Sequence, residues 1–166
     1  MNRRDVQERL TQLRLHMPAI RLYALVDGVQ YSDHMNAPLA PRPGFASLFE
    51  NTLDAELAHA GPWLIDAAEV GDAIIDDLAE LEQTAPAVVW LFAYQDPGGL
   101  AQLLQLNLDM ALPDGRSALL RLWDPRVLIS LVEILNSDQR EQLFGQVHEW
   151  YLLHDGRRTW IGRPNA

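Results

Sequence analysis

The sequence predicts a single α/β domain in which a mixed β-sheet is flanked by helices, with hairpins toward the C-terminus. Apolar strand-like segments alternate with helix-like segments for most of the chain, which favours this class. Residues 87–94 (AVVWLFAY) are apolar almost throughout, as in a strand buried on both faces. The last third instead contains strand-like pairs around turn sequences. The 166 residues suffice for one hydrophobic core, and we expect residues 1–166 to form one domain.

The first half of the chain carries both kinds of periodicity. Val6, Leu10 and Leu13 form one apolar stripe, which predicts a helix that Pro18 ends. Apolar runs bounded by turn residues predict strands, and clustered prolines predict a loop. The expected elements are a helix over 3–15, a strand over 21–28 with an Asp27–Gly28 turn, an irregular loop over 31–44, a short apolar segment over 45–52, a short helix over 53–61, a strand over 62–67, a helix over 71–83 and the strand over 87–94.

In the second half, aspartate–proline pairs mark helix starts. Asp96–Pro97 and Asp124–Pro125 each supply an N-cap and a first-turn proline. The expected elements are a helix over 98–106, a hairpin over 108–124 that turns at 113–115, a helix after Pro125, a helix over 137–144 and a hairpin over 147–162 that turns at 155–156. We expect 87–94 and 118–124 to be strands of one sheet. The expected core includes Ile74, Leu78, Leu104, Leu128 and Leu131.

Composition excludes several classes of protein. The net charge of −10 argues against nucleic-acid binding, because phosphates require a basic patch. No apolar stretch approaches the roughly 20 residues that span a bilayer, and the charged N-terminus does not resemble a secretion signal. The chain contains no cysteine, and all 13 basic residues are arginine, so thiol, Schiff-base and Walker-A chemistry are excluded. These features predict a cytoplasmic protein.

Acidic residues gather in one segment of the chain. Between Arg42 and Arg116 there is no arginine or lysine. A solvated helix face is the simplest explanation, and a surface for a basic partner is the alternative. The acidic residues of this segment are Glu50, Asp54, Glu56, Asp66, Glu69, Asp72, Asp76, Asp77, Glu80 and Glu82.

No catalytic constellation stands out, and no cofactor is predicted. Asp27, Asp66 and Asp124 each follow an apolar segment, where three carboxylates could hold Mg²⁺ for a hydrolase. Aspartate is also common at turns and helix caps, which is the simpler explanation. The five histidines lack metal-ligand spacing, and no serine lies in a G-x-S-x-G elbow.

The stretch LLRLWDPRVL, residues 119–128, is the most distinctive part of the chain. In a strand, Arg121 and Trp123 share one face. Arg121 is then half-buried beside an aromatic ring and needs an acidic or carbonyl partner. Asp124 can cap the following helix and pair with an arginine at once. We therefore interpret these residues as a structural clamp and not as an acid–base centre.

Five segments in order resemble one family, the type VI secretion effector adaptors, also called Tap or TEC chaperones (domain-of-unknown-function family 4123). The segments are LYALVDG, SLFENTLDAELAHAGPWLID, AVVWLFAY, LPDGRSALLRLWDPRVL and FGQVHEWYL. The resemblance runs from about Arg21 to Trp160. It implies a cytoplasmic, non-enzymatic protein that binds the N-terminal region of a toxic effector and helps load it onto the spike protein VgrG. The residues that match the family's signature are Tyr23, Asp27, Gly28, Pro62, Trp63, Gly115, Arg121, Asp124, Pro125 and Arg126.

Two features bear on how such a protein would bind its partners. Many members of the family carry a long C-terminal extension, whereas this chain ends at Ala166, soon after the last hairpin. Trp150, Tyr151 and Trp160 are expected partner contacts, because alternation turns one of Trp150 and Tyr151 away from the core. The alternative is that all three aromatics cover the core.

Two other functions stay open at the level of the sequence. One is an immunity protein that binds and inhibits a toxin domain. The other is the divalent-metal hydrolase built on the three aspartates.

Overall fold

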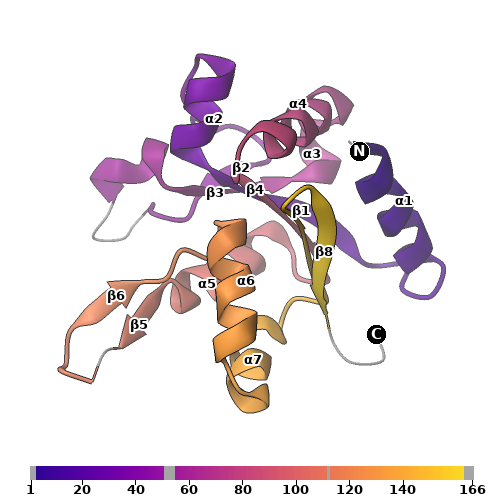
Figure 1. Ribbon diagram of the computed structural model, residues 1–166. Coiled ribbons are helices and arrows are strands. Elements are labelled where there is room, and N and C mark those ends of the chain that lie inside the picture. Colours follow the sequence, from indigo (N-terminus) through magenta and orange to yellow (C-terminus); the bar gives the residue numbers. More distant parts are fainter. Residues whose placement is uncertain (1–2, 51–54, 112, 163–166) are drawn as a thin grey trace.

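The structure, a computed structural model, describes residues 3–50, 55–111 and 113–162. Helices cover both faces of a β-sheet (Figure 1), so the expected single α/β domain is confirmed. The elements in chain order are α1 (Arg3–Arg14), β1 (Arg21–Asp27), α2 (Gly28–Met35), β2 (Phe45–Ser47), the 3₁₀ helix η1 (Ala55–Ala60), β3 (Pro62–Asp66), α3 (Ala67–Val70), α4 (Asp72–Thr84), β4 (Val88–Ala93), α5 (Pro97–Asn107), β5 (Asp109–Ala111), β6 (Ser117–Leu119), α6 (Pro125–Ile134), α7 (Ser137–Phe144), β7 (Glu149–His154) and β8 (Arg157–Gly162).

The main sheet has six strands in the order β2-β3-β1-β4-β7-β8, and every pair is antiparallel. This differs from the expected mixed sheet. The helical connection from β3 to β4 does join two strands that run in the same direction, as the alternation of strands and helices predicted. β1 lies between them and pairs with both, so no parallel pair forms among the described strands.

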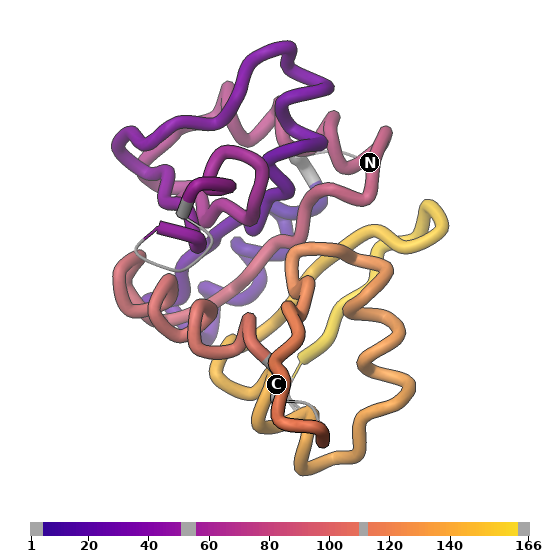
Figure 2. The backbone as a smooth tube through the Cα atoms, turned by 90° about the vertical axis from the view of Figure 1, so that its left-hand side faces the viewer, coloured from indigo at the N-terminus to yellow at the C-terminus, as the bar shows by residue number. Residues whose placement is uncertain are grey.

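Both faces of the sheet are buried. On one face, α1, α2 and α4 pack against alternate strand residues such as Trp90 and Tyr151. On the other face, α5, α6 and α7 pack against the residues between them, such as Leu91 and Trp150. Figure 2 shows α2 and α4 above the strands and α6 and α7 below them. Burial on two sides explains why residues 87–94 are apolar without alternation.

The expected core is confirmed at four positions. Leu78, Leu104, Leu128 and Leu131 are buried, whereas Ile74 is only partly buried at the margin of the core. Val88 to Leu91 form a buried strand as predicted. No helix in the described ranges is long and apolar enough to cross a membrane.

Two local predictions were wrong. Part of the expected loop over 31–44 is helical, since α2 begins directly after Asp27, whose carboxylate caps it. Of the expected strand over 118–124, only the first two residues are extended; they belong to β6, which pairs with β5 in a separate two-stranded sheet. Leu122 and Trp123 are both buried in one core. A strand would point these neighbours to opposite faces, so the chain bends there instead.

Candidate functional site

Two buried aspartates organise the family-like signature. Asp27 ends β1 and accepts hydrogen bonds from the backbone N–H of Val29 and Gln30, so it caps α2. Asp124 accepts a hydrogen bond from the backbone N–H of Arg126 and caps α6, with Pro125 at its first turn. The N-cap and first-turn proline predicted at Asp124–Pro125 are therefore confirmed for α6.

Asp124 and Arg126 form a two-point ion pair. Nε and Nη2 of Arg126 donate to the two carboxylate oxygens of Asp124 at 3.0 and 2.9 Å. Burial opposes ionisation of Asp124, but the hydrogen bonds from the side chain and backbone of Arg126 outweigh it, so the pKa of Asp124 lies below its ordinary value. The carboxylate is buried while the Arg126 side chain is 63% exposed. The pair thus holds a guanidinium at the surface.

Asp124 thus caps α6 and pairs with an arginine, as the clamp hypothesis expected. Arg121 pairs with a different aspartate. Its Nη2 lies 3.7 Å from Oδ2 of Asp27, and its guanidinium lies 5.6 Å from the centre of the Trp123 ring. The side chain is 50% exposed, so the expected aromatic contact and half-burial are correct. The acidic partner comes from β1, which lies far away in the sequence. Asp27, Arg121, Asp124 and Arg126 therefore gather at one end of the sheet.

Gly28 is required by close packing and not by a turn. A Cβ atom at this position would lie 2.2 Å from the carbonyl oxygen of His59 and 2.8 Å from that of Gly61. The Gly28 N–H donates to the same Gly61 oxygen at 2.9 Å. In the Asp27–Gly28 pair, the aspartate caps α2 and the glycine lets the start of the helix pack closely against the backbone of residues 59–61. The expected turn is replaced by the start of a helix.

The remaining signature residues make structural contacts of their own. Tyr23 is buried and donates to the carbonyl oxygen of Gln95 at 2.6 Å, and burial raises its pKa to about 12. Pro62 begins β3 opposite Asp27, and Trp63 beside it is fully buried. Gly115 has a φ of 87° at the tip of the β5–β6 hairpin, where left-handed backbone favours glycine.

The three aspartates of the hydrolase hypothesis do not converge. Asp66 lies opposite Tyr23 in the register, whereas Asp27 lies opposite Pro62. At about 3.3 Å per residue, roughly 13 Å of strand separates Asp27 from Asp66. Each of the three carboxylates caps a helix. Within the described ranges, no three histidine or acidic side chains are grouped to hold a metal ion.

The comparison with family models decides the relationship of this chain to known proteins. The model described as "Domain of unknown function (DUF4123)" matches residues 22–142. The chain belongs to this family. The family is the one known as the type VI effector adaptors, Tap or TEC, so the predicted resemblance is confirmed. No curated protein and no solved structure matches the chain.

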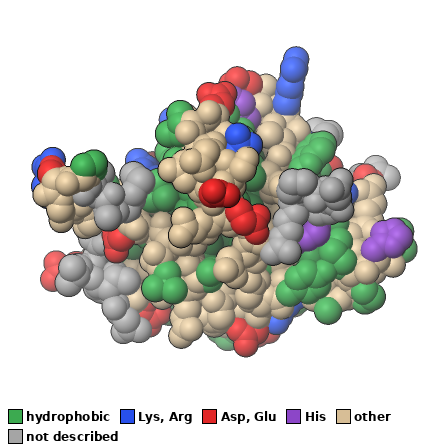
Figure 3. Space-filling view, turned by 90° about the horizontal axis from the view of Figure 1, so that it is seen from below, with side chains coloured by type: hydrophobic (Ala, Val, Ile, Leu, Met, Phe, Trp, Pro, Cys, Tyr) green, Lys and Arg blue, Asp and Glu red, His purple; other side chains and the backbone are tan. Residues whose placement is uncertain are grey.

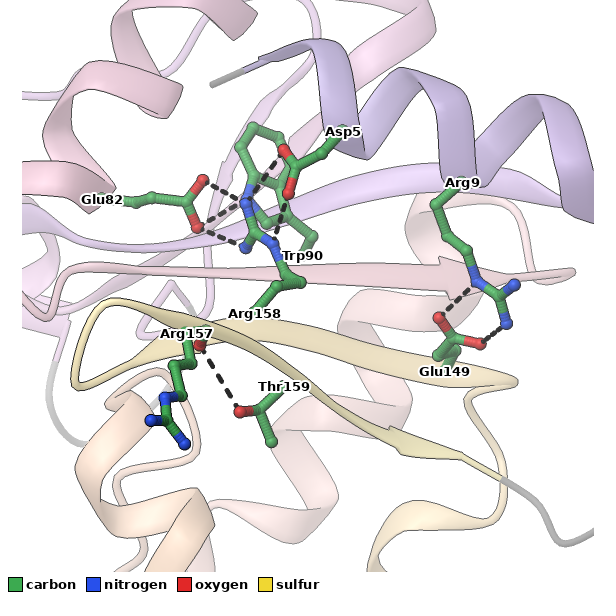
Figure 4. A network of polar contacts seen from close by, with 8 residues as sticks. All are labelled: Asp5, Arg9, Glu82, Trp90, Glu149, Arg157, Arg158 and Thr159. Carbon is green, nitrogen blue, oxygen red and sulfur yellow. Dashed lines mark hydrogen bonds and ion pairs between the residues drawn. The ribbon is translucent and has the colours of Figure 1, made fainter. Parts of the chain in front are cut away.

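The match to the DUF4123 family does not include the two ends of the chain. α1 precedes the matched residues, and β7 and β8 follow them. Arg158 of β8 donates to the carboxylates of Asp5 in α1 and Glu82 in α4, at 2.7 to 3.2 Å (Figure 4). Trp90 donates to Glu82 as well, at 3.1 Å. Arg9 of α1 forms a second ion pair, with the buried Glu149 of β7.

Sequence reasoning missed this buried network. The network around Arg158 draws on four elements, α1, α4, β4 and β8. Only the fold brings them together, and no local motif connects them. The one available signal was the adjacent pair Arg157–Arg158 on an expected strand, because alternation turns one of two neighbouring arginines inward. In the structure Arg158 is the inward residue and Arg157 is exposed.

The three aromatics expected to contact a partner differ in exposure. Trp150 and Tyr151 point to opposite faces, as alternation requires, but both are buried because helices cover both faces. The expectation that one of them points away from the core was therefore wrong. Trp160 on β8 is 61% exposed and is therefore accessible to a partner.

Other exposed apolar side chains are dispersed over the molecule. Seen from below, the hydrophobic groups form separate patches among charged and neutral ones (Figure 3). The large exposed apolar residues are Leu15, Val29, Leu57, Tyr94, Leu106, Leu119, Ile134 and Trp160. Trp160 has the largest side chain of this set.

Only some of the acidic residues between Glu50 and Glu82 are exposed at the surface. Asp66 and Glu82 are buried, and they pair with Arg21 and Arg158 from outside the segment. Asp54 lies outside the described residues. The exposed members are Glu50, Glu56, Glu69, Asp72, Asp76 and Glu80, and Asp77 is half-buried.

Proposed function

We propose that this protein is a cytoplasmic adaptor, or chaperone, that binds the N-terminal, non-catalytic region of a type VI secretion effector and helps load it onto the VgrG spike. The observation that carries the proposal is membership of the DUF4123 family over residues 22–142. In this role the protein performs no reaction and needs no cofactor. We further propose that residues 1–166 act as one adaptor domain, and that neither nucleic acid nor a membrane is a partner.

The signature cluster supports a contact role for two arginines. Arg121 and Arg126 expose their guanidinium groups, while the carboxylates beside them, Asp27 and Asp124, are buried. A buried carboxylate orients an exposed guanidinium without removing it from solvent. Arginines held in this way suit the carboxylates and carbonyl groups of a protein partner.

Co-purification tests the proposal directly. The protein is co-expressed with the N-terminal fragment of the effector encoded beside its gene, and separately with the C-terminal tip of the neighbouring spike protein. We expect it to capture both. The exposed carboxylates between Glu50 and Glu80 offer a second candidate surface, for a basic partner, so we expect weaker capture at high salt.

A matched pair of variants tests the two arginines. Replacing both Arg121 and Arg126 with glutamine should weaken capture of the effector fragment and leave the fold intact. Arg116→Gln is the control, since Arg116 is also exposed and paired to a neighbouring aspartate but lies in the β5–β6 hairpin. Equal capture by both variants would remove the signature arginines from the contact surface.

The immunity hypothesis predicts a different outcome of the same experiment. An immunity protein would capture neither the N-terminal fragment nor the spike tip. It would instead bind the isolated toxin domain and rescue cells from it. That result would replace the adaptor proposal.

A further inference from the structure

The last strand forms one edge of the main sheet. Among the described residues, β8 pairs with β7 on one side and with no strand on the other. A pocket of about 440 Å³ lies along this edge, where β8 faces α6 and α7. In Figure 1, β8 (yellow) runs beside α6 (orange). The pocket is lined by Val132, Arg140, Phe144, Trp160, Ile161 and Gly162, among others.

The hairpin turn fixes which backbone groups of β8 point outward. Asp155 and Gly156 have φ values of 51° and 74°, which are those of a two-residue type I′ turn. In such a hairpin the residues that flank the turn, His154 and Arg157, exchange hydrogen bonds, and bonded and non-bonded pairs then alternate. The residues of β8 whose N–H and C=O groups point away from β7 are therefore Arg158, Trp160 and Gly162.

Side chains on both faces border this edge. Trp160 lies opposite Tyr151 in the register, on the face that α1 covers, and most of its ring is exposed. Ile161 lies on the other face, packs against the core there and lines the pocket together with Val132 and Phe144. A strand added beside β8 would place alternate side chains against Trp160 and against the pocket.

We propose that β8 receives an extended segment of the protein's partner as a seventh, antiparallel or parallel strand, with apolar side chains at alternate positions. This inference rests on the proposed function, in which that partner is the effector's N-terminal region. A strand is the occupant because outward N–H and C=O groups at every second residue match an extended backbone. A second copy of this chain is disfavoured, because two molecules with a net charge of −10 repel each other.

A proline substitution tests the backbone pairing. Gly162→Pro removes an outward N–H and leaves the inward ladder to β7 intact, as prolines on edge strands do. Gly162→Ala is the matched control, since a Cβ atom there meets nothing closer than 3.7 Å and the N–H remains. With the effector fragment as probe in calorimetry, we expect about tenfold weaker binding for the proline variant and near-wild-type binding for the alanine variant. Trp160→Ala should weaken binding about thirtyfold.

Residue-resolved amide hydrogen exchange tests the register. In the free protein, the amides of Arg158 and Trp160 should exchange quickly, and those of Thr159 and Ile161 slowly. The bound fragment should protect the first pair and leave the second unchanged.

The outcomes separate this inference from the proposed function. If the fragment binds but neither Gly162→Pro nor amide exchange responds, the edge is not the site and the adaptor proposal stands. If the fragment does not bind the wild-type protein, both fall. If the amides become protected in the protein alone as its concentration rises, with a doubled mass, the edge pairs with a second copy and the inference is overturned.

Discussion

Arg158 on the last strand and Asp5 on the first helix lie 153 positions apart in the sequence, and two hydrogen bonds of 2.8 and 3.2 Å join them. The same guanidinium bonds to Glu82 and lies 4.6 Å from the centre of the Tyr151 ring. One arginine therefore ties α1, α4 and the C-terminal hairpin together. This closure lies largely outside the residues that define the family.

Removal of Arg158 should destabilise the protein strongly. Arg158→Met leaves the buried carboxylate of Glu82 without its cation, which costs about 3–5 kcal/mol of unfolding free energy. Urea denaturation measures the loss. Arg157→Met is the control, because Arg157 is exposed, and it should stay within about 0.5 kcal/mol of wild type. Similar losses in both variants would contradict a specific role of the network.

The titration of Glu82 should be visible in stability. Burial raises the pKa of Glu82 above its ordinary value of 4.5, although Arg158 partly offsets this. A raised folded-state pKa contributes stability that is complete below the unfolded value and is lost as pH rises through the folded value. Wild type should therefore lose stability relative to Glu82→Gln as pH rises from 4.5 through that raised pKa. Unfolding free energies at several pH values check this, and a constant difference would refute it.

Asp124→Ala should cost about 0.5–2 kcal/mol through the lost helix cap. The loss of its ion pair adds little, because Arg126 is mostly exposed. Asp124→Asn keeps a capping oxygen and should cost less. Since the pKa of Asp124 is lowered, its ionic contribution is present above 3.8 and disappears as pH falls through the folded-state pKa. The gap between wild type and Asp124→Asn, measured by thermal unfolding, should narrow there; an Asn variant as unstable as the Ala variant would argue against the cap.

Gly28→Ala should be severely destabilising. The new methyl group would meet backbone oxygens at 2.2 and 2.8 Å, and backbone cannot move aside as a flexible side chain can. We expect a loss of about 3 kcal/mol or more, at the upper end for overpacked sites. Gly98→Ala is the control in the first turn of another helix, where the nearest atom lies 3.9 Å away. It should be neutral or stabilising in chemical denaturation, and equal losses would contradict the packing argument.

The two tryptophans of the last hairpin should behave oppositely. Trp150 is buried and its Nε1 donates to the carbonyl oxygen of Phe144, so Trp150→Ala should cost about 3–5 kcal/mol. Trp160 is mostly exposed, so Trp160→Ala should change the melting temperature little. A large loss at Trp160 would mean that it supports the fold and is unsuited to a contact role.

The sequence predicted the parts of this protein that depend on local chemistry. The strand over residues 87–94, the Asp124–Pro125 helix start and the hairpin that turns at Asp155–Gly156 were all foreseen. Capping, proline geometry and hydrophobic periodicity act within a few residues, so they can be read without knowing the fold. The signature that led to the family is of the same kind.

Only the tertiary structure decided which distant residues meet. It placed β1 between β3 and β4, paired Arg121 with Asp27, and joined Arg158 to Asp5 and Glu82. It also buried Tyr151, which alternation alone left open, by covering the second face of the sheet with helices. Strand order and helix packing depend on the free energy of the whole core, to which no short segment of sequence corresponds.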